Sequence, residues 1–256
     1  MILALDIGNT HIGLGGFRDD RLAFVANLSS NPALTGDEYA CKLLDVLSLY
    51  HVDPSQVEGA ILSSVVPALN DAIQAAVRAA CGVKPLVVGP GIKTGIGIRC
   101  DNPVSVGADL ICACVAVNRL YGGPALIVDM GTATKMMVLD DHGAFIGVSI
   151  VPGVRMGLKA LSDGTAQLPQ VSLETPAAVI GKNTADCMRS GVIYGNASMV
   201  DGMIRRINDE YGKELPVIAT GGAAPAILPH CTSSYTMDEH LVLKGLCFLY
   251  QKNKEK

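Results

Sequence analysis

Two short polar turns, each directly after an apolar segment typical of a strand, contain the residue types that bind phosphate. Residues 6–10 read Asp-Ile-Gly-Asn-Thr and follow the apolar segment 1–5, and residues 129–134 read Asp-Met-Gly-Thr-Ala-Thr and follow 125–128. Glycine lets backbone N–H groups converge on an anion, Asn and Thr donate further hydrogen bonds, and the carboxylate can hold a magnesium ion or its waters. We therefore expect both turns to bind polyphosphate.

Two further sites are predicted in the same way, from residue type and position relative to a strand or helix. Gly221 and Gly222 come after a predicted strand, and let the backbone pass flat beneath an adenine or ribose. Asp109 follows a glycine and precedes an apolar segment at 110–117, so its carboxylate is expected near a helix N-terminus. There it could accept a proton from an alcohol that attacks a phosphoryl group. The alternative is that Asp109 only caps the helix, and the sequence leaves both open.

The spacing of the turns predicts an internal repeat. Asp6 and Asp129 lie almost half of the 256-residue chain apart, and each opens a strand, turn, strand unit. D-x-G turns also commonly connect strands without any binding function. The order of these turns along the chain, rather than any one of them, therefore favours a shared function. We expect two lobes, residues 1–118 and 119–256, divided near the Gly-Gly-Pro turn at 122–124.

Hydrophobic periodicity places the elements that position these residues. Helices are expected at 38–50, 70–81, 154–161, 183–211 and 238–250, and further strands at 59–66, 85–88 and 215–220. Alternation of strands with helices predicts an α/β protein with mostly parallel sheets.

Composition narrows the class of function. A net charge of −4 without a basic cluster argues against nucleic acid and anionic membranes as partners. The chain opens on a strand pattern rather than a secretion signal, and its longest apolar runs are too short to span a bilayer. Its eight scattered cysteines lack metal-ligand spacing and indicate reduced thiols. We expect a cytoplasmic enzyme.

Along nearly its whole length the chain resembles the type III pantothenate kinase family. The matching stretches are collinear and lie at 6–10, 63–67, 102–103, 107–109, 129–134, 152–153, 165–169, 180–184 and 219–222. The resemblance implies two similar lobes of the ribonuclease H-like type found in actin, Hsp70 and sugar kinases, with the nucleotide cleft between them. It also implies ATP-dependent phosphorylation of pantothenate to 4'-phosphopantothenate, the first step of coenzyme A biosynthesis, by a homodimer.

The resemblance also assigns roles to residues. Asp6 would organise Mg²⁺ and the ATP phosphates, Asp109 would be the general base, and Asp129 would help bind a monovalent cation, K⁺ or NH₄⁺. The residues implied in nucleotide binding are Asp6, Gly8, Asn9, Thr10, Gly131, Thr132, Thr134, Gly221 and Gly222. Those implied at the pantothenate end are Cys100, Gly107, Ala108, Asp109, Leu110 and Thr184.

Four departures from the family pattern affect this site. His11 stands where the family has a small polar residue, often Asn, after the first polar turn. Leu110 stands where the family has Arg and Cys100 where it has Tyr, so groups suited to an acidic substrate are missing. This keeps a second function open, that of an altered-substrate or non-catalytic paralogue that binds nucleotide. Lys135 replaces a Thr; it could supply charge to the phosphates, occupy the cation position, or point to solvent.

Overall fold

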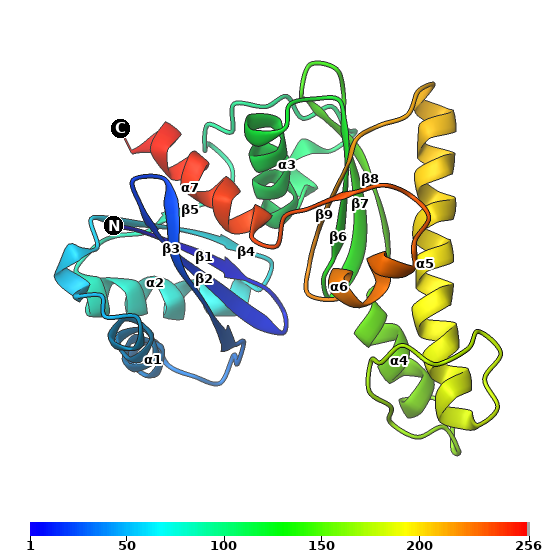
Figure 1. Ribbon diagram of the computed structural model, residues 1–256. Coiled ribbons are helices and arrows are strands. Elements are labelled where there is room, and N and C mark those ends of the chain that lie inside the picture. The colour runs from blue at the N-terminus through cyan, green and yellow to red at the C-terminus, as the bar shows by residue number, and fades with distance from the viewer. Residues whose placement is uncertain (255–256) are drawn as a thin grey trace. The chain divides into compact units, whose positions relative to one another are not determined.

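The computed structural model describes residues 1–254, which form two compact lobes (Figure 1). The first lobe consists of Met1–Tyr121 together with residues 241–254, and the second of Gly122–His240. Each lobe has its own five-stranded sheet. Residues 255–256, which belong to the expected lobe 119–256, lie outside the described residues.

The first sheet has the strand order β3-β2-β1-β4-β5. Strand β2 runs antiparallel to both β1 and β3, whereas β1, β4 and β5 are parallel to one another. The strands are β1 Ile2–Ile7, β2 His11–Arg18, β3 Arg21–Ser29, β4 Gly59–Ser64 and β5 Leu86–Val87.

The second sheet has the order β10-β9-β6-β7-β8, which is the same arrangement. Its first strand, β6, is central, with an antiparallel meander on one side and parallel strands on the other. The strands are β6 Ala125–Met130, β7 Ala133–Leu139, β8 Phe145–Pro152, β9 Val217–Thr220 and β10 Thr236–Met237. The predicted two similar α/β lobes are confirmed. The expectation of mostly parallel sheets is wrong, because tight turns connect the first three strands of each lobe and such turns join antiparallel strands.

Helices cover both faces of the first sheet. Helices α1 (Gly36–Leu49) and α2 (Pro67–Cys81) pack against the face that carries Leu3, Leu5 and Ile7. Helices α3 (Ala108–Leu120) and α7 (Leu241–Asn253) pack against the opposite face, which carries Ala4. Because side chains alternate along a strand, Asp6 lies on the α3 and α7 face.

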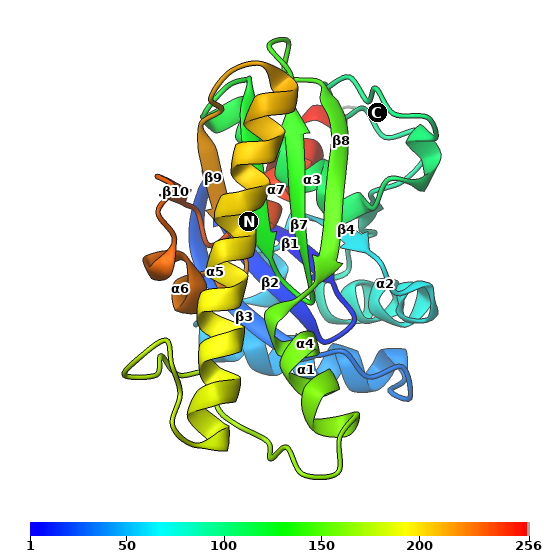
Figure 2. The same ribbon diagram turned by 90° about the vertical axis from the view of Figure 1, so that its right-hand side faces the viewer.

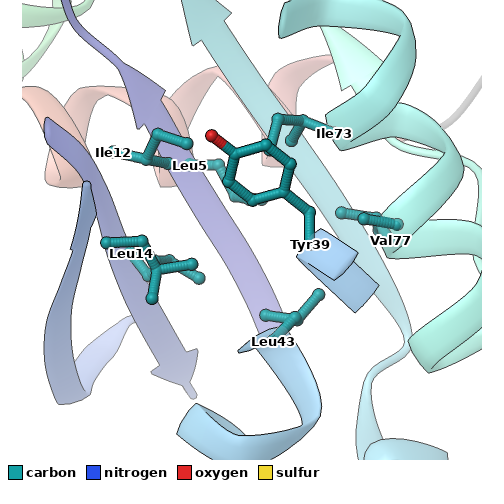
Figure 3. A pocket seen from close by; sticks show the side chains of 9 residues that line it. Leu5, Ile12, Leu14, Tyr39, Leu43, Ile73 and Val77 are labelled. Carbon is teal, nitrogen blue, oxygen red and sulfur yellow. The ribbon is translucent and has the colours of Figure 1, made fainter. Parts of the chain in front are cut away.

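A packing void of about 10 Å³ lies beneath α1 and α2. It is lined by apolar side chains from β1, β2, α1 and α2, with the Tyr39 ring between them (Figure 3). The Tyr39 hydroxyl donates to the carbonyl of Asn31 at 3.1 Å. A void this small and apolar belongs to the hydrophobic core and offers no ligand site.

The lobe to which helix α7 belongs differs from the expected division of the chain. The prediction assigned residues 119–256 to one lobe, but α7 packs on α3, β1 and β4 of the first lobe. A Cβ atom added to Gly245 would lie 1.9 Å from the Cys112 carbonyl oxygen, so glycine allows α7 to approach the α3 backbone closely. Sequence spacing could not reveal this return, since it depends on a contact between distant segments.

In the second lobe, the long helix α5 (Thr184–Tyr211) runs along one face of the sheet, as Figure 2 shows. Its apolar side chains pack with Val128, Met130 and Met136 in one core. Helices α4 (Val154–Asp163) and α6 (Ala224–Ile227) complete this lobe.

Short 3-10 helices lie at Pro54–Gln56, Pro103–Ser105 and Leu228–His230. Among the described residues, no helix has both the length and the apolar character needed to cross a membrane.

Candidate functional site

The first polar turn connects β1 to β2 and is tied down by its neighbours. The Gly8 amide donates to the His11 carbonyl at 3.0 Å. Ser30, directly after β3, donates its hydroxyl to the Gly8 carbonyl at 2.5 Å and its amide to the Thr10 carbonyl at 3.1 Å. The side chains of Asn9 and Thr10 are exposed. The turn is therefore held by its backbone, and its polar side chains lie at the surface.

Asp6 stands at the carboxyl end of β1, immediately before this turn. The Ser63 hydroxyl, from the neighbouring position of the parallel strand β4, donates to Asp6 Oδ1 at 2.6 Å. Ser63 is fully buried and Asp6 is half-buried. On the other side, the residue opposite Asp6 is Gly13, which contributes no side chain. A half-exposed carboxylate, oriented by a hydroxyl and without a bulky neighbour on β2, fits a magnesium ion or its bound water.

Asp109 lies in the first turn of α3, half-buried. The N-cap residue of this helix is Gly107, which has no side chain to cap it. The alternative in which Asp109 is itself the N-cap is therefore wrong. Its carboxylate carries the negative charge favoured at a helix N-terminus.

Cys112, one turn further along α3, is a buried thiol on which both Asp6 and Asp109 act. Burial raises the pKa of the Cys112 thiol well above its ordinary value, and the charges of Asp6 and Asp109 raise it further. A hydrogen bond with Ser63 acts in the opposite direction. Asp6, Ser63 and Asp109, from β1, β4 and α3, therefore all lie within electrostatic or hydrogen-bonding range of the same buried thiol.

The residues expected at the pantothenate end divide between the lobes. Gly107 and Ala108 are half-buried at the start of α3, next to Asp109. Leu110 is buried, with 7% of its surface exposed. Cys100 is half-buried in the loop before the 3-10 helix Pro103–Ser105. Thr184, the first residue of α5, is exposed and belongs to the second lobe.

The second polar turn connects β6 to β7 as the first connects β1 to β2. Half-buried Gly131 and exposed Thr132 form the turn. Thr134 lies within β7, on the sheet face of Met130 and Met136, and is fully buried. Its hydroxyl has no hydrogen-bond partner within the described part of the chain. Thr132 is thus the threonine of this turn with an exposed side chain, whereas Thr134 faces the core.

Gly221 and Gly222 follow β9 and pack beside this turn. Gly221 has a φ of +98°, and a Cβ atom there would lie 2.5 Å from the Met130 carbonyl carbon and 2.7 Å from Asp129 Oδ1. The Ala223 amide donates to the Met130 carbonyl at 3.0 Å. Only glycine combines this conformation with so close an approach. Gly222, by contrast, is exposed.

Asp129 and Lys135 form an ion pair inside this site. They lie opposite each other on β6 and β7, and Lys135 Nζ is 2.8 Å from Asp129 Oδ2. Their side chains are only 15% and 11% exposed, respectively. The ammonium therefore contacts the carboxylate that was expected to help bind a monovalent cation. Of the alternatives for Lys135, a side chain directed to solvent is wrong.

Ser30 and Ser63 were not predicted as site residues. Ser63 belongs to a stretch that matches the family, but nothing in its own sequence context assigns it to Asp6. The pairing follows from the register of β1 and β4. The indication available in the sequence was a polar pair, Ser63 and Ser64, at the end of an otherwise apolar strand.

Comparison with solved structures agrees with the two-lobed fold. The activator of 2-hydroxyisocaproyl-CoA dehydratase from Clostridium difficile, solved with bound ADPNP, matches with a TM-score of 0.59, 14% identity and coverage of 99% of this chain and 94% of that one. Component A of (R)-2-hydroxyglutaryl-CoA dehydratase from Acidaminococcus fermentans matches with a TM-score of 0.58, 13% identity and coverage of 99% and 98%. Identities this low show the fold alone.

Comparison of sequences identifies the family. Residues 2–206 match the family described as type III pantothenate kinase. A type III pantothenate kinase from Moorella thermoacetica is 41% identical, over 99% of this chain and 100% of that protein. Another from an Exiguobacterium species is 42% identical over 100% of both. The chain belongs to the type III pantothenate kinase family.

Proposed function

We propose that this chain phosphorylates pantothenate with ATP, giving 4'-phosphopantothenate and ADP in the first step of coenzyme A biosynthesis. Full-length similarity to type III pantothenate kinases supports the activity. The observation within the structure that best supports it is that Asp6, which accepts a hydrogen bond from Ser63, and Asp109 both act on the same buried thiol, Cys112, in the first lobe. This lobe thus offers one carboxylate for the metal of a nucleotide and a second carboxylate for proton transfer.

In the proposed reaction, Asp109 accepts the proton of the pantothenate hydroxyl. The hydroxyl oxygen then forms a bond to the γ-phosphorus of ATP, and the bond between that phosphorus and the β,γ-bridging oxygen breaks, releasing ADP. Asn9, Thr10 and Thr132 are exposed at the two turns and bind phosphate oxygens. Gly221 and Gly222 border the adenosine. Most of the rate enhancement in such a transfer comes from positioning and charge stabilisation.

Asp6 is the residue that would hold Mg²⁺ or its waters, with Ser63 fixing the orientation of the carboxylate. Bound magnesium would neutralise charge on the phosphates. The pantothenate end of the first lobe is formed by Gly107, Ala108 and Asp109 together with Cys100 and Leu110. We further propose a homodimer, and the cytoplasm, where ATP is available, as its compartment.

One observation favours the second function, a paralogue that binds nucleotide but acts on another alcohol or on none. Leu110 offers no hydrogen-bond donor to the pantothenate carboxylate, and it is buried. A non-catalytic paralogue would retain the phosphate turns and lose the acceptor.

The test is ATP consumption by the purified protein with Mg²⁺, with and without pantothenate, and identification of the product by mass spectrometry. Pantothenate-dependent formation of phosphopantothenate is the expected result. Nucleotide binding without phosphopantothenate would contradict the proposal and support the second function. Asp109→Asn serves as the matched control, because it removes the proposed base and changes neither phosphate turn.

A further inference from the structure

The internal repeat permits a direct comparison of what surrounds the two turn carboxylates. Asp6 and Asp129 are each the penultimate residue of the central strand of their sheet. The residue opposite on the parallel neighbour carries a hydroxyl in both lobes, Ser63 in one and Thr220 in the other. The residue opposite on the hairpin strand differs, since Gly13 in the first lobe corresponds to Lys135 in the second.

We propose that the Lys135 ammonium supplies the positive charge at the second polar turn, residues 129–134, and so takes the place of a bound monovalent cation. This inference rests on the proposed function, because it assumes that the turn binds the phosphates of ATP. It predicts that nucleotide binding and turnover do not depend on K⁺ or NH₄⁺.

The packing around Asp129 supports this inference. Lys135 Nζ is 2.8 Å from Asp129 Oδ2. On its other side, Asp129 Oδ1 lies 2.7 Å from the position a Cβ would take on Gly221, and 3.3 Å from that on Gly131. The carboxylate thus lies between an ammonium and the backbone of two glycine turns. An added metal ion would need the oxygen that the ammonium contacts, so these residues do not fit a monovalent cation at Asp129.

The pair also lies where its charge can act on a ligand. Lys135 is on β7 close to exposed Thr132, and its side chain is 15% exposed. Ile150, opposite Lys135 on β8, is 59% exposed, so this part of the sheet is open to solvent. A mostly desolvated ammonium held by a carboxylate is preorganised for anionic oxygens, because it needs little rearrangement when they bind.

The experiment measures binding of a non-hydrolysable ATP analogue with Mg²⁺ by calorimetry, while K⁺ is replaced by choline at constant ionic strength. For the wild-type protein, we expect a dissociation constant that changes less than about twofold. In Lys135→Thr, which shortens the side chain and leaves space at Asp129, binding should weaken by at least about tenfold in choline and recover on adding K⁺. In Lys135→Met, which keeps the length and removes the charge, binding should weaken without recovery.

The wild-type titration needs no variant, so the inference stays testable if a substitution impairs folding. Saturable strengthening of wild-type binding by K⁺ would overturn it, as would wild-type affinity in Lys135→Met without K⁺. These outcomes differ from failure of the proposed function, in which the analogue binds but phosphopantothenate does not form at any K⁺ concentration. If the wild-type protein binds no nucleotide, the proposed function and this inference both fail.

Discussion

The two lobes have the same strand order and place an aspartate at the same position, yet they surround it differently. In the first lobe, Asp6 accepts a hydrogen bond from Ser63 and faces Gly13 across the hairpin. In the second, Asp129 forms an ion pair with Lys135. A carboxylate beside a glycine leaves space for a hydrated metal ion, whereas one beside a lysine already has its cation. One residue on the hairpin strand therefore separates a carboxylate suited to a metal from one that serves as a structural anchor.

The largest expected effect concerns proton transfer in the first lobe. Asp109→Asn removes the proposed base but keeps the size of the side chain. We expect kcat to fall by about 100- to 10,000-fold, the usual contribution of a general base. Affinity for ATP should change little, because Asp109 is not part of either phosphate turn. Steady-state kinetics and calorimetric ATP binding test this, and unchanged turnover would rule out the base assignment.

The second prediction concerns the anchor in the second lobe. Asp129→Asn leaves the Lys135 ammonium mostly buried without its carboxylate, which costs about 3 kcal/mol when a buried pair is broken. The melting temperature should fall by roughly 5 °C or more. The double variant Asp129→Asn with Lys135→Met removes both charges and should recover much of that loss. Asp6→Asn is the matched control in the first lobe and should mainly reduce activity. Equal melting temperatures for Asp129→Asn and Asp6→Asn would contradict the inference that Asp129, unlike Asp6, stabilises its lobe through an ion pair.

A smaller effect is expected from Ser63→Ala. Loss of the hydroxyl that donates to Asp6 at 2.6 Å should lower kcat about tenfold and weaken the apparent affinity for Mg²⁺. A purely structural role would lower stability and leave the Mg²⁺ dependence unchanged. Ser64→Ala is the control, since the Ser64 hydroxyl donates instead to the Val66 carbonyl. Measuring turnover as a function of Mg²⁺ concentration for the two variants distinguishes a role of Ser63 in Mg²⁺ binding from a purely structural role.

The smallest effect for a single residue is the share of each buried thiol in a loss of stability in alkali, which arises mainly in the first lobe. Burial raises the pKa of the Cys81 thiol to about 11 and that of Cys247 to about 12, and it also raises the pKa values of Cys112 and Cys114. The folded protein therefore keeps protons that the unfolded chain releases above about pH 8.5. This stability is present below that pH and is lost as the pH rises, by at most about 1.4 kcal/mol per pH unit for each thiol.

Melting temperatures at pH 7.5 and 9.5, with reductant present, measure this loss. Cys247→Ala should make the decrease less steep, whereas Cys187→Ala in the second lobe should not, because Cys187 is exposed. A decrease that is the same for both variants would contradict the assignment to buried thiols.

Local sequence patterns predicted most of the elements. The capping box of Thr35 and Glu38 starts α1 close to the predicted residue 38, and Asn183 caps α5 where the predicted helix 183–211 begins. Apolar spacing fixes such elements because it reflects one buried face. The meander strand β3 (Arg21–Ser29) was not predicted, since its mixture of polar and apolar residues gives no clear period.

The sequence by itself determined the family, the two-lobed repeat and the turns that carry polar residues, because these depend on short motifs and on their order. The tertiary structure decided three things that motifs cannot specify: the return of α7 to the first lobe, the hydrogen bond from Ser63 to Asp6, and the ion pair of Lys135 with Asp129. Each depends on strand register or on close contact between segments distant in the chain. Such contacts are set by packing of the whole lobe, and no local stretch of sequence contains them.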